Sequence, residues 1–216
     1  MELVIPLKRA WKQIILIRHA ATDMAGVLCG HSDPPINQTG QEQVASLVRQ
    51  LRERPIGRIY SSDLRRAAQT AEALAVSRGI PLFCRKELRE ISFGAWEGLR
   101  WAEVQARSPE YPGPGFESLQ GRGAPNGETI RDFRARVLSA LDAIASDASA
   151  RRPIAVVTHL GVIRTAMTEL ANIDRQSELL RQISCCSAHG FRVDRRGWTM
   201  SEGGRLPFYG PYEKRR

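Results

Sequence analysis

The chain has 216 residues, of which 42% are hydrophobic and 25% are charged, values that are ordinary for a folded globular protein. This length predicts a single domain spanning residues 1–216 with an ample core. The formal net charge is +9, and arginine dominates it because the chain has few lysines. The arginines are spread along the chain and are not interleaved with aromatic residues. The charge therefore favours attraction of a small anionic molecule over binding of nucleic acid.

No apolar stretch approaches the length of a membrane span, and the apolar start of the chain is too short for a signal peptide. The four cysteines include no Cys-x-x-Cys spacing and form no convincing disulfide framework. These features favour a cytoplasmic protein with reduced thiols and without a membrane partner.

Strand-like and helix-like segments alternate along the chain. The run Ile14-Ile15-Leu16-Ile17 is continuously apolar, which is typical of a strand buried on both faces of a parallel sheet. In chain order we expect a strand at 14–17, a loop at 20–38, a helix from Thr39 to before Pro55, a strand at 58–61, a helix capped by Ser62 or Asp63 and ended by Gly79, a strand at 81–84, a long helix at about 128–146, a strand at 154–158, a helix opening near Gly161, and strand-like segments at 189–194 and 197–200.

This alternation predicts an α/β fold with three layers, in which helices cover both faces of a mostly parallel central sheet. Residues 105–127 are rich in Gly and Pro and are the least regular part of the chain. We expect an irregular insertion or lid at about residues 100–127.

Two of the predicted strands are each followed at once by a histidine. Arg18 and His19 follow the first strand, and His159 follows the strand at 154–158. Ligands of open α/β sheets bind just beyond the carboxyl ends of such strands. The sequence therefore predicts that both histidines lie at one edge of the sheet, in a centre that handles phosphate.

Four segments can be considered together because of their order. They are residues 16–22, 61–71, 88–98 and 157–164, which carry Arg18-His19-Ala20-Ala21-Thr22, Asp63-Leu64-Arg65-Arg66, Arg89-Glu90-Ile91-Ser92-Phe93-Gly94-Ala95-Trp96-Glu97-Gly98 and Thr158-His159-Leu160-Gly161. In this order the set resembles the histidine phosphatase superfamily, which has the phosphoglycerate mutase-like fold. The resemblance runs from about residue 13 to 170 and includes the Gly127-Glu128-Thr129 element.

The resemblance implies a role for five side chains. His19 is the expected nucleophile, which forms a covalent phosphohistidine, and Glu90 is the expected general acid and then general base. Arg18, Arg66 and His159 are expected to bind the phosphate, because guanidinium groups offer planar forks of donors to its oxygens. The pattern implies no cofactor, and no cluster has the spacing of metal ligands. Each residue alone could be structural, but the four segments in this order favour a site.

Two of these assignments have neighbours as rivals. Arg66 is preferred over Arg65 only by its register in the helix, and Glu87 and Glu97 are rival carboxyl groups for the acid role of Glu90.

The remaining candidates concern the surroundings of the site. Thr22 and Trp101 are candidates for the substrate pocket, although packing explains Trp101 equally well. His31 is expected in a loop near the mouth of the site, and His189 is expected to be structural.

The sequence departs from the family pattern near the first histidine. Ala20 stands where the family usually has Gly, and Ala25 stands where many members carry an Asn that contacts the phosphate. A mutase must hold a second anionic group while its substrate reorients, which needs additional cations at the mouth. These departures disfavour a strict mutase.

The compact length and the Phe-Gly-x-Trp-Glu-Gly block are most similar to the small phosphatases of the superfamily, such as α-ribazole phosphatases. The resemblance thus implies a metal-independent phosphomonoesterase that acts on a small phosphorylated metabolite, with α-ribazole 5'-phosphate as one candidate. A phosphoglycerate mutase-type phosphotransferase and a catalytically silent phosphate-binding module of the same fold are the alternatives. The oligomeric state is open, and a homodimer is one option.

Overall fold

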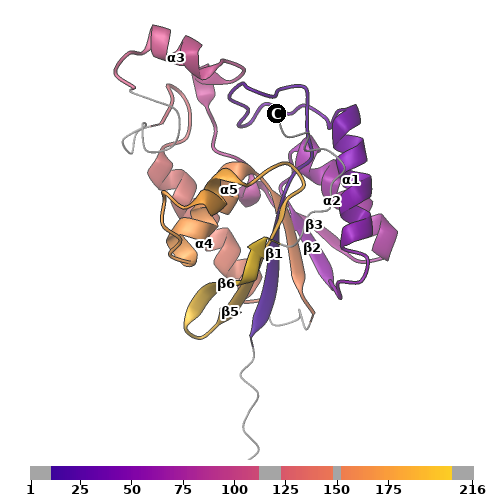
Figure 1. Cartoon of the computed structure of the whole chain (residues 1–216). Coiled ribbons are helices and arrows are strands. Elements are labelled where there is room, and N and C mark those ends of the chain that lie inside the picture. The colour runs from indigo at the N-terminus through magenta and orange to yellow at the C-terminus, as the bar shows by residue number, and fades with distance from the viewer. Residues whose placement is uncertain (1–10, 112–122, 148–151, 206–216) are drawn as a thin grey trace, which may run out of the picture.

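A six-stranded sheet forms the centre of the protein (Figure 1). In this computed structural model, which describes residues 11–111, 123–147 and 152–205, the strands are β1 (Lys12–Arg18), β2 (Arg58–Ser61), β3 (Leu82–Cys84), β4 (Ile154–Thr158), β5 (Ala188–Asp194) and β6 (Gly197–Arg205). Their order across the sheet is β3-β2-β4-β1-β5-β6. Strands β1 to β4 are parallel, whereas β5 runs antiparallel to β1 and β6 antiparallel to β5.

Helices cover both faces of this sheet (Figure 1). The helical elements are α1 (Gln38–Gln50), α2 (Arg65–Arg78), α3 (Trp101–Arg107), α4 (Ile130–Ala145), α5 (Leu160–Thr165) and α6 (Glu178–Arg181), the 3-10 turns η1 (Lys86–Leu88) and η2 (Gly94–Trp96), and the π-helical turn η4 (Ala166–Leu170). Helices α1 and α2 lie on one face, and α4 and α5 lie on the other. The α/β, three-layer prediction is confirmed. None of the described helices combines the length and the apolar character needed to cross a membrane.

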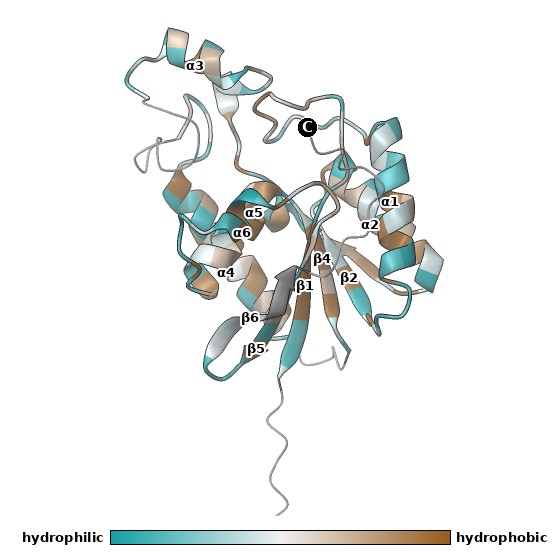
Figure 2. Cartoon of the chain, viewed as in Figure 1, coloured by the Kyte–Doolittle hydropathy of each residue, from teal (hydrophilic) through white to brown (hydrophobic). Residues whose placement is uncertain are grey.

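The apolar run of β1 is buried on both faces of the sheet. Ile14 and Leu16 pack into the core beneath α4, whereas Ile15 and Ile17 pack into the core beneath α1 and α2. Figure 2 shows the hydrophobic residues gathered on the strands and on the helix faces that cover them. The central strands are therefore fixed from both sides, and the loops that follow them start from a rigid base.

The register of β1 and β4 brings the two predicted histidines together. Arg18 lies opposite Thr158 in the parallel pairing, so His19 and His159 leave the sheet at the same edge. The backbone N–H of His19 donates to the carbonyl of Thr158 at 2.8 Å. Strand β2 lies on the other side of β4, and the N–H of Ser62 donates to the carbonyl of Val157 at 3.0 Å.

The predicted cap of α2 is wrong. Helix α2 begins at Arg65 with Leu64 as its N-cap, and no side chain caps it. Ser62 is instead engaged by His159, and the carboxylate of Asp63 binds the guanidinium of Arg89 at 2.6 and 2.7 Å. Both predicted cap residues, Ser62 and Asp63, thus use their side chains in tertiary contacts instead of capping the helix. Gly79 ends the helix in the left-handed conformation, as predicted.

Two other boundaries differ from the expectation. Helix α1 begins at Gln38, because the Asn37 side chain accepts a hydrogen bond from the N–H of Gly40. The start of the stretch predicted to be irregular is helical, since α3 occupies Trp101–Arg107. Residues 112–122 of that stretch lie outside the described residues.

Candidate active site

A cavity of about 320 Å³ lies at the carboxyl ends of β1 and β4. Six of the seven residues singled out from the sequence line it, namely Arg18, His19, Thr22, Arg66, Glu90 and Trp101. The seventh, His159, is fully buried beside it, with its ring centroid 5.1 Å from that of His19. The structure therefore brings all seven residues together at one edge of the sheet.

The imidazole of His19 presents an unprotonated nitrogen at this site. Its Nδ1 lies 2.7 Å from the carbonyl of Ala20, and because a carbonyl can only accept, Nδ1 carries the proton. Nε2 is therefore the atom with the free electron pair, and it accepts a hydrogen bond from Nε of Arg66 at 3.3 Å. Burial and the guanidinium of Arg66 together lower the pKa of His19 to about 3.

In the free protein, His19 is expected to remain neutral from about pH 8 to about pH 5, whereas an unperturbed histidine titrates near 6.5. Protonation would begin only as the pH falls toward about 3. The Cε1–H resonance of His19, assigned by its disappearance in a His19→Asn variant, checks this by NMR titration. A midpoint near 6.5 would contradict the geometry.

The imidazole of His159 has a polar partner on one side only. Its Nε2 lies 2.9 Å from the hydroxyl of Ser62, which also accepts from the N–H of Leu64 at 3.3 Å. Its Nδ1 is buried and has no partner among the described residues. Burial, His19 and Arg66 hold the pKa of His159 well below its usual range.

The guanidinium of Arg66 is held in place by the main chain of the loop after β1. Arg66 is only 1% exposed. It donates to the carbonyls of Ser32 at 2.7 Å, Gly30 at 2.8 Å and Cys29 at 3.2 Å. Because these oxygens fix its plane, Arg66 is oriented toward His19 before any ligand binds.

Glu97 holds the same loop in place through hydrogen bonds to residues 30–32. Its carboxylate accepts from the N–H groups of Gly30 at 3.0 Å, His31 at 2.8 Å and Ser32 at 3.1 Å, and from the Ser32 hydroxyl at 2.6 Å. Burial raises the pKa of Glu97, but these hydrogen bonds outweigh it and lower the pKa overall. A side chain at Gly30 would meet the carbonyl of Ile91 at 2.1 Å. Glu97 is thus occupied with the loop and is absent from the cavity lining.

The second arginine, Arg18, reaches across to the segment before β5. Its Nη1 donates to the carbonyl of Ile183 at 2.8 Å, and its Nε is buried without a partner among the described residues. Together with Arg66 it places two guanidinium groups around His19.

The carboxyl group of Glu90 lies at the edge of the cavity and is 8% exposed. One oxygen accepts from the N–H of Ile91 at 3.1 Å, and the other accepts from the N–H of Gly161 at 3.0 Å. The rival Glu87 does not line the cavity. Of the three candidate acids, only Glu90 lines the cavity together with His19.

The rest of the cavity wall is mostly apolar. Thr22 is 9% exposed, and Trp101 both lines the cavity and packs edge-on against Trp96 with the ring centroids 6.1 Å apart. Sequence reasoning missed Arg164 in the lining, although its place in the fourth segment could have shown it. The full set of other lining residues is Ala21, Met24, Ala25, Gly26, Val27, Leu28, Cys29, Phe93, Leu160, Gly161, Arg164 and Cys185.

The two remaining histidines do not line the cavity. Nε2 of His31 lies 3.0 Å from the main-chain carbonyl of Glu90. His189 is 2% exposed, and its Nε2 lies 2.9 Å from the hydroxyl of Ser187.

Two guanidinium groups and two neutral imidazoles, of which His19 keeps a free electron pair on Nε2, lie at the carboxyl edge of a parallel sheet, an arrangement typical of an α/β protein that handles phosphoryl groups. The sequence profile of the histidine phosphatase superfamily (branch 1) matches residues 14–204, and the chain belongs to that family. This membership confirms the predicted family and the class of enzyme. Within the described residues, no three His, Cys, Asp or Glu side chains are grouped as a metal site would require.

Curated relatives and solved structures agree with this membership. The chain is 32% identical over 178 residues to a metal-independent phosphoserine phosphatase of Arabidopsis thaliana, covering 78% of this chain and 72% of the relative. It is 29% identical over 167 residues to an adenosylcobalamin/alpha-ribazole phosphatase of Salmonella typhimurium, covering 75% and 81%. Its fold is similar to that of a phosphoglycerate mutase from Bacillus anthracis, with a TM-score of 0.76, 22% identity and coverage of 92% and 95%.

Proposed function

We propose that this protein hydrolyses phosphate monoesters of small metabolites through a phosphohistidine formed at His19. The observation that carries the proposal is the state of His19, whose Nδ1–H is committed to the carbonyl of Ala20 while Nε2 keeps its electron pair. A neutral imidazole held in this way can attack phosphorus without first losing a proton. The low pKa of His19 supports the same conclusion.

In the first step, Nε2 of His19 bonds to phosphorus and the bond from phosphorus to the leaving oxygen breaks. The leaving alkoxide takes a proton from the Glu90 carboxyl, which lines the same cavity. Arg18 and Arg66 face the charge that spreads over the other phosphate oxygens. We assign the proton of His159 to Nδ1, which has no partner among the described residues, and so make it a further donor to these oxygens.

In the second step, water attacks the phosphorus and the bond to Nε2 breaks. The Glu90 carboxylate now takes a proton from the attacking water, and inorganic phosphate leaves. The same two side chains are thereby restored to their starting states. All of the chemistry is assigned to residues of this chain, so the proposed hydrolysis needs no metal ion.

The apolar wall and the modest volume of the cavity support a small substrate. The named relatives are a phosphoserine phosphatase and an adenosylcobalamin/alpha-ribazole phosphatase, and phosphoserine and α-ribazole phosphate are small phosphate monoesters. We therefore place phosphoserine, α-ribazole 5'-phosphate and 3-phosphoglycerate in the first test panel. Conversion of 3-phosphoglycerate to its isomer without release of phosphate would show a mutase instead.

The decisive assay is release of phosphate from para-nitrophenyl phosphate in the presence of a metal chelator. The purified protein is expected to turn over this substrate at the same rate with and without chelator. Activity that is lost in chelator and restored by a divalent ion would contradict the mechanism. Binding of phosphate without any turnover would indicate a silent binding module.

A further inference from the structure

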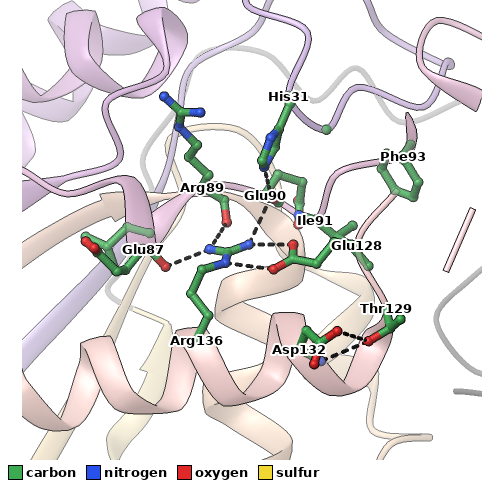
Figure 3. A network of polar contacts seen from close by, with 12 residues as sticks. His31, Glu87, Arg89, Glu90, Ile91, Phe93, Glu128, Thr129, Asp132 and Arg136 are labelled. Carbon is green, nitrogen blue, oxygen red and sulfur yellow. Dashed lines mark hydrogen bonds and ion pairs between the residues drawn. The ribbon is translucent and has the colours of Figure 1, made fainter. Parts of the chain in front are cut away.

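One arginine of helix α4, Arg136, donates hydrogen bonds to the main chain around Glu90. Figure 3 shows the guanidinium of Arg136 directed at the segment from Glu87 to Glu90. Arg136 donates to the carbonyls of Glu87 at 2.7 Å, Arg89 at 3.1 Å and Glu90 at 3.4 Å. Three carbonyls within four residues therefore converge on one side chain.

The remaining donors of Arg136 bind Glu128. Nε donates to Oε1 at 2.8 Å and Nη2 donates to Oε2 at 2.7 Å, so the pair is bidentate. A guanidinium has five N–H groups, and these two bonds and the three to carbonyls account for all five. The two side chains are only 21% and 17% exposed. Glu128 thus both neutralises Arg136 and fixes the plane of its donors.

Glu128 is itself fixed at the start of α4. Its N–H donates to the carbonyl of Ser92 at 3.0 Å. The next residue, Thr129, caps the helix by accepting from the N–H of Asp132 at 3.1 Å (Figure 3). The support for Arg136 therefore comes from a capped helix end that is also hydrogen-bonded to the chain just after Glu90.

Other contacts limit how the Glu90 segment can move. The hydroxyl of Thr158, at the end of β4, donates to the carbonyl of Leu88 at 2.7 Å. His31 reaches the carbonyl of Glu90 from the opposite loop at 3.0 Å (Figure 3). Since the Glu90 carboxyl is held by only two backbone N–H groups, a shift of its main chain would move it relative to His19.

We infer that Arg136, oriented by Glu128, is a positioning residue for the Glu90 carboxyl and so sets the efficiency of proton transfer to the leaving group. The inference rests on the proposed function, because it assigns Arg136 to a step that Glu90 performs. Neither Arg136 nor Glu128 lines the cavity, so both act through the main chain. A purely structural pair would instead affect stability and all substrates alike.

The test compares an alkyl phosphate, whose leaving group needs a proton, with para-nitrophenyl phosphate, whose leaving group does not. Arg136→Lys keeps the charge but cannot supply five donors in one plane. It is expected to lower the rate of phosphoenzyme formation from the alkyl phosphate by about 10²-fold, the loss typical of a displacement near 1 Å, and to change the rate of this first step for the aryl phosphate little. Inhibition by inorganic phosphate should be unchanged, because Arg136 contacts no phosphate-binding residue in the described contacts.

Arg134→Lys is the matched control. Arg134 lies on the same helix and pairs with Glu169 at 3.8 Å, away from the Glu90 segment, so this change should leave both rates unaltered. Glu128→Gln provides a second variant in case Arg136→Lys fails to fold, and it should lower the alkyl rate selectively. Combining Arg136→Lys with Glu90→Gln should add no further selectivity to that of Glu90→Gln alone.

Equal losses in the rate of phosphoenzyme formation from both substrates, in the folded Arg136→Lys or Glu128→Gln variant, would overturn the inference. If Glu90→Gln is selective and these two variants are not, the positioning role fails while the proposed function stands. If Glu90→Gln itself shows no selectivity, the acid role of Glu90 fails and the positioning role fails with it.

Discussion

Replacing His19 with alanine is expected to abolish turnover and the covalent phosphoenzyme together. In the proposed mechanism the imidazole supplies the atom that bonds to phosphorus, and its Nε2 carries the free electron pair. Loss of a covalent nucleophile elsewhere lowers kcat by about 10⁶-fold, and an effect of that order is expected here. Steady-state assays and trapping of a radiolabelled phosphoenzyme after rapid quenching measure the two consequences.

His19→Asn serves as the companion variant, because its amide retains part of the ring's shape and polarity. Both variants should still bind inorganic phosphate through Arg18 and Arg66, which calorimetry can measure. A labelled phosphoenzyme that persists in either variant would place the covalent bond on another residue.

Glu90→Gln is expected to produce the second large effect, and its size should depend on the leaving group. The substitution keeps the size of the side chain and removes its ability to transfer a proton. General acid catalysis is typically worth about 10²–10⁴ in rate, so an alkyl phosphate should lose a factor in that range. An activated aryl phosphate should lose much less in the first step, and a burst of phenolate followed by slow turnover is expected because water still needs a base.

Two neighbouring carboxylates provide controls for this result. Glu87 does not line the cavity, and Glu97 is bonded to the loop beneath Arg66, so Glu87→Gln and Glu97→Gln should show no dependence on the leaving group. An equal loss for alkyl and aryl substrates in Glu90→Gln, without a burst, would mean that the acid lies elsewhere.

Much of the fold could be predicted from the sequence because the central strands are buried on both faces. The uninterrupted apolar runs of β1 and β4 have that origin, and the positions of His19 and His159 follow from where those strands end. The amphipathic pattern of α4 likewise matches the helix found at Ile130–Ala145. Local pattern sufficed wherever burial alone determined the structure.

Local pattern failed where a polar side chain is used by a distant part of the chain. Ser62 and Asp63 are residue types that commonly cap helices. Here, however, Ser62 is hydrogen-bonded to His159 and Asp63 to Arg89. The role of Arg136 could not be predicted from the sequence. Its main-chain partners are carbonyl groups nearly fifty residues away, and every residue has such a group. Such hydrogen bonds to the main chain can be seen only once the chain is folded.

The loop carbonyls that hold the guanidinium of Arg66 determine which sequence changes this loop can tolerate. Its three acceptors are the backbone oxygens of Cys29, Gly30 and Ser32, and every amino acid offers the same oxygen. What must be inherited in this loop is therefore its length and the missing side chain at Gly30, more than the identity of the other residues. A single-residue deletion here would do more harm than most substitutions.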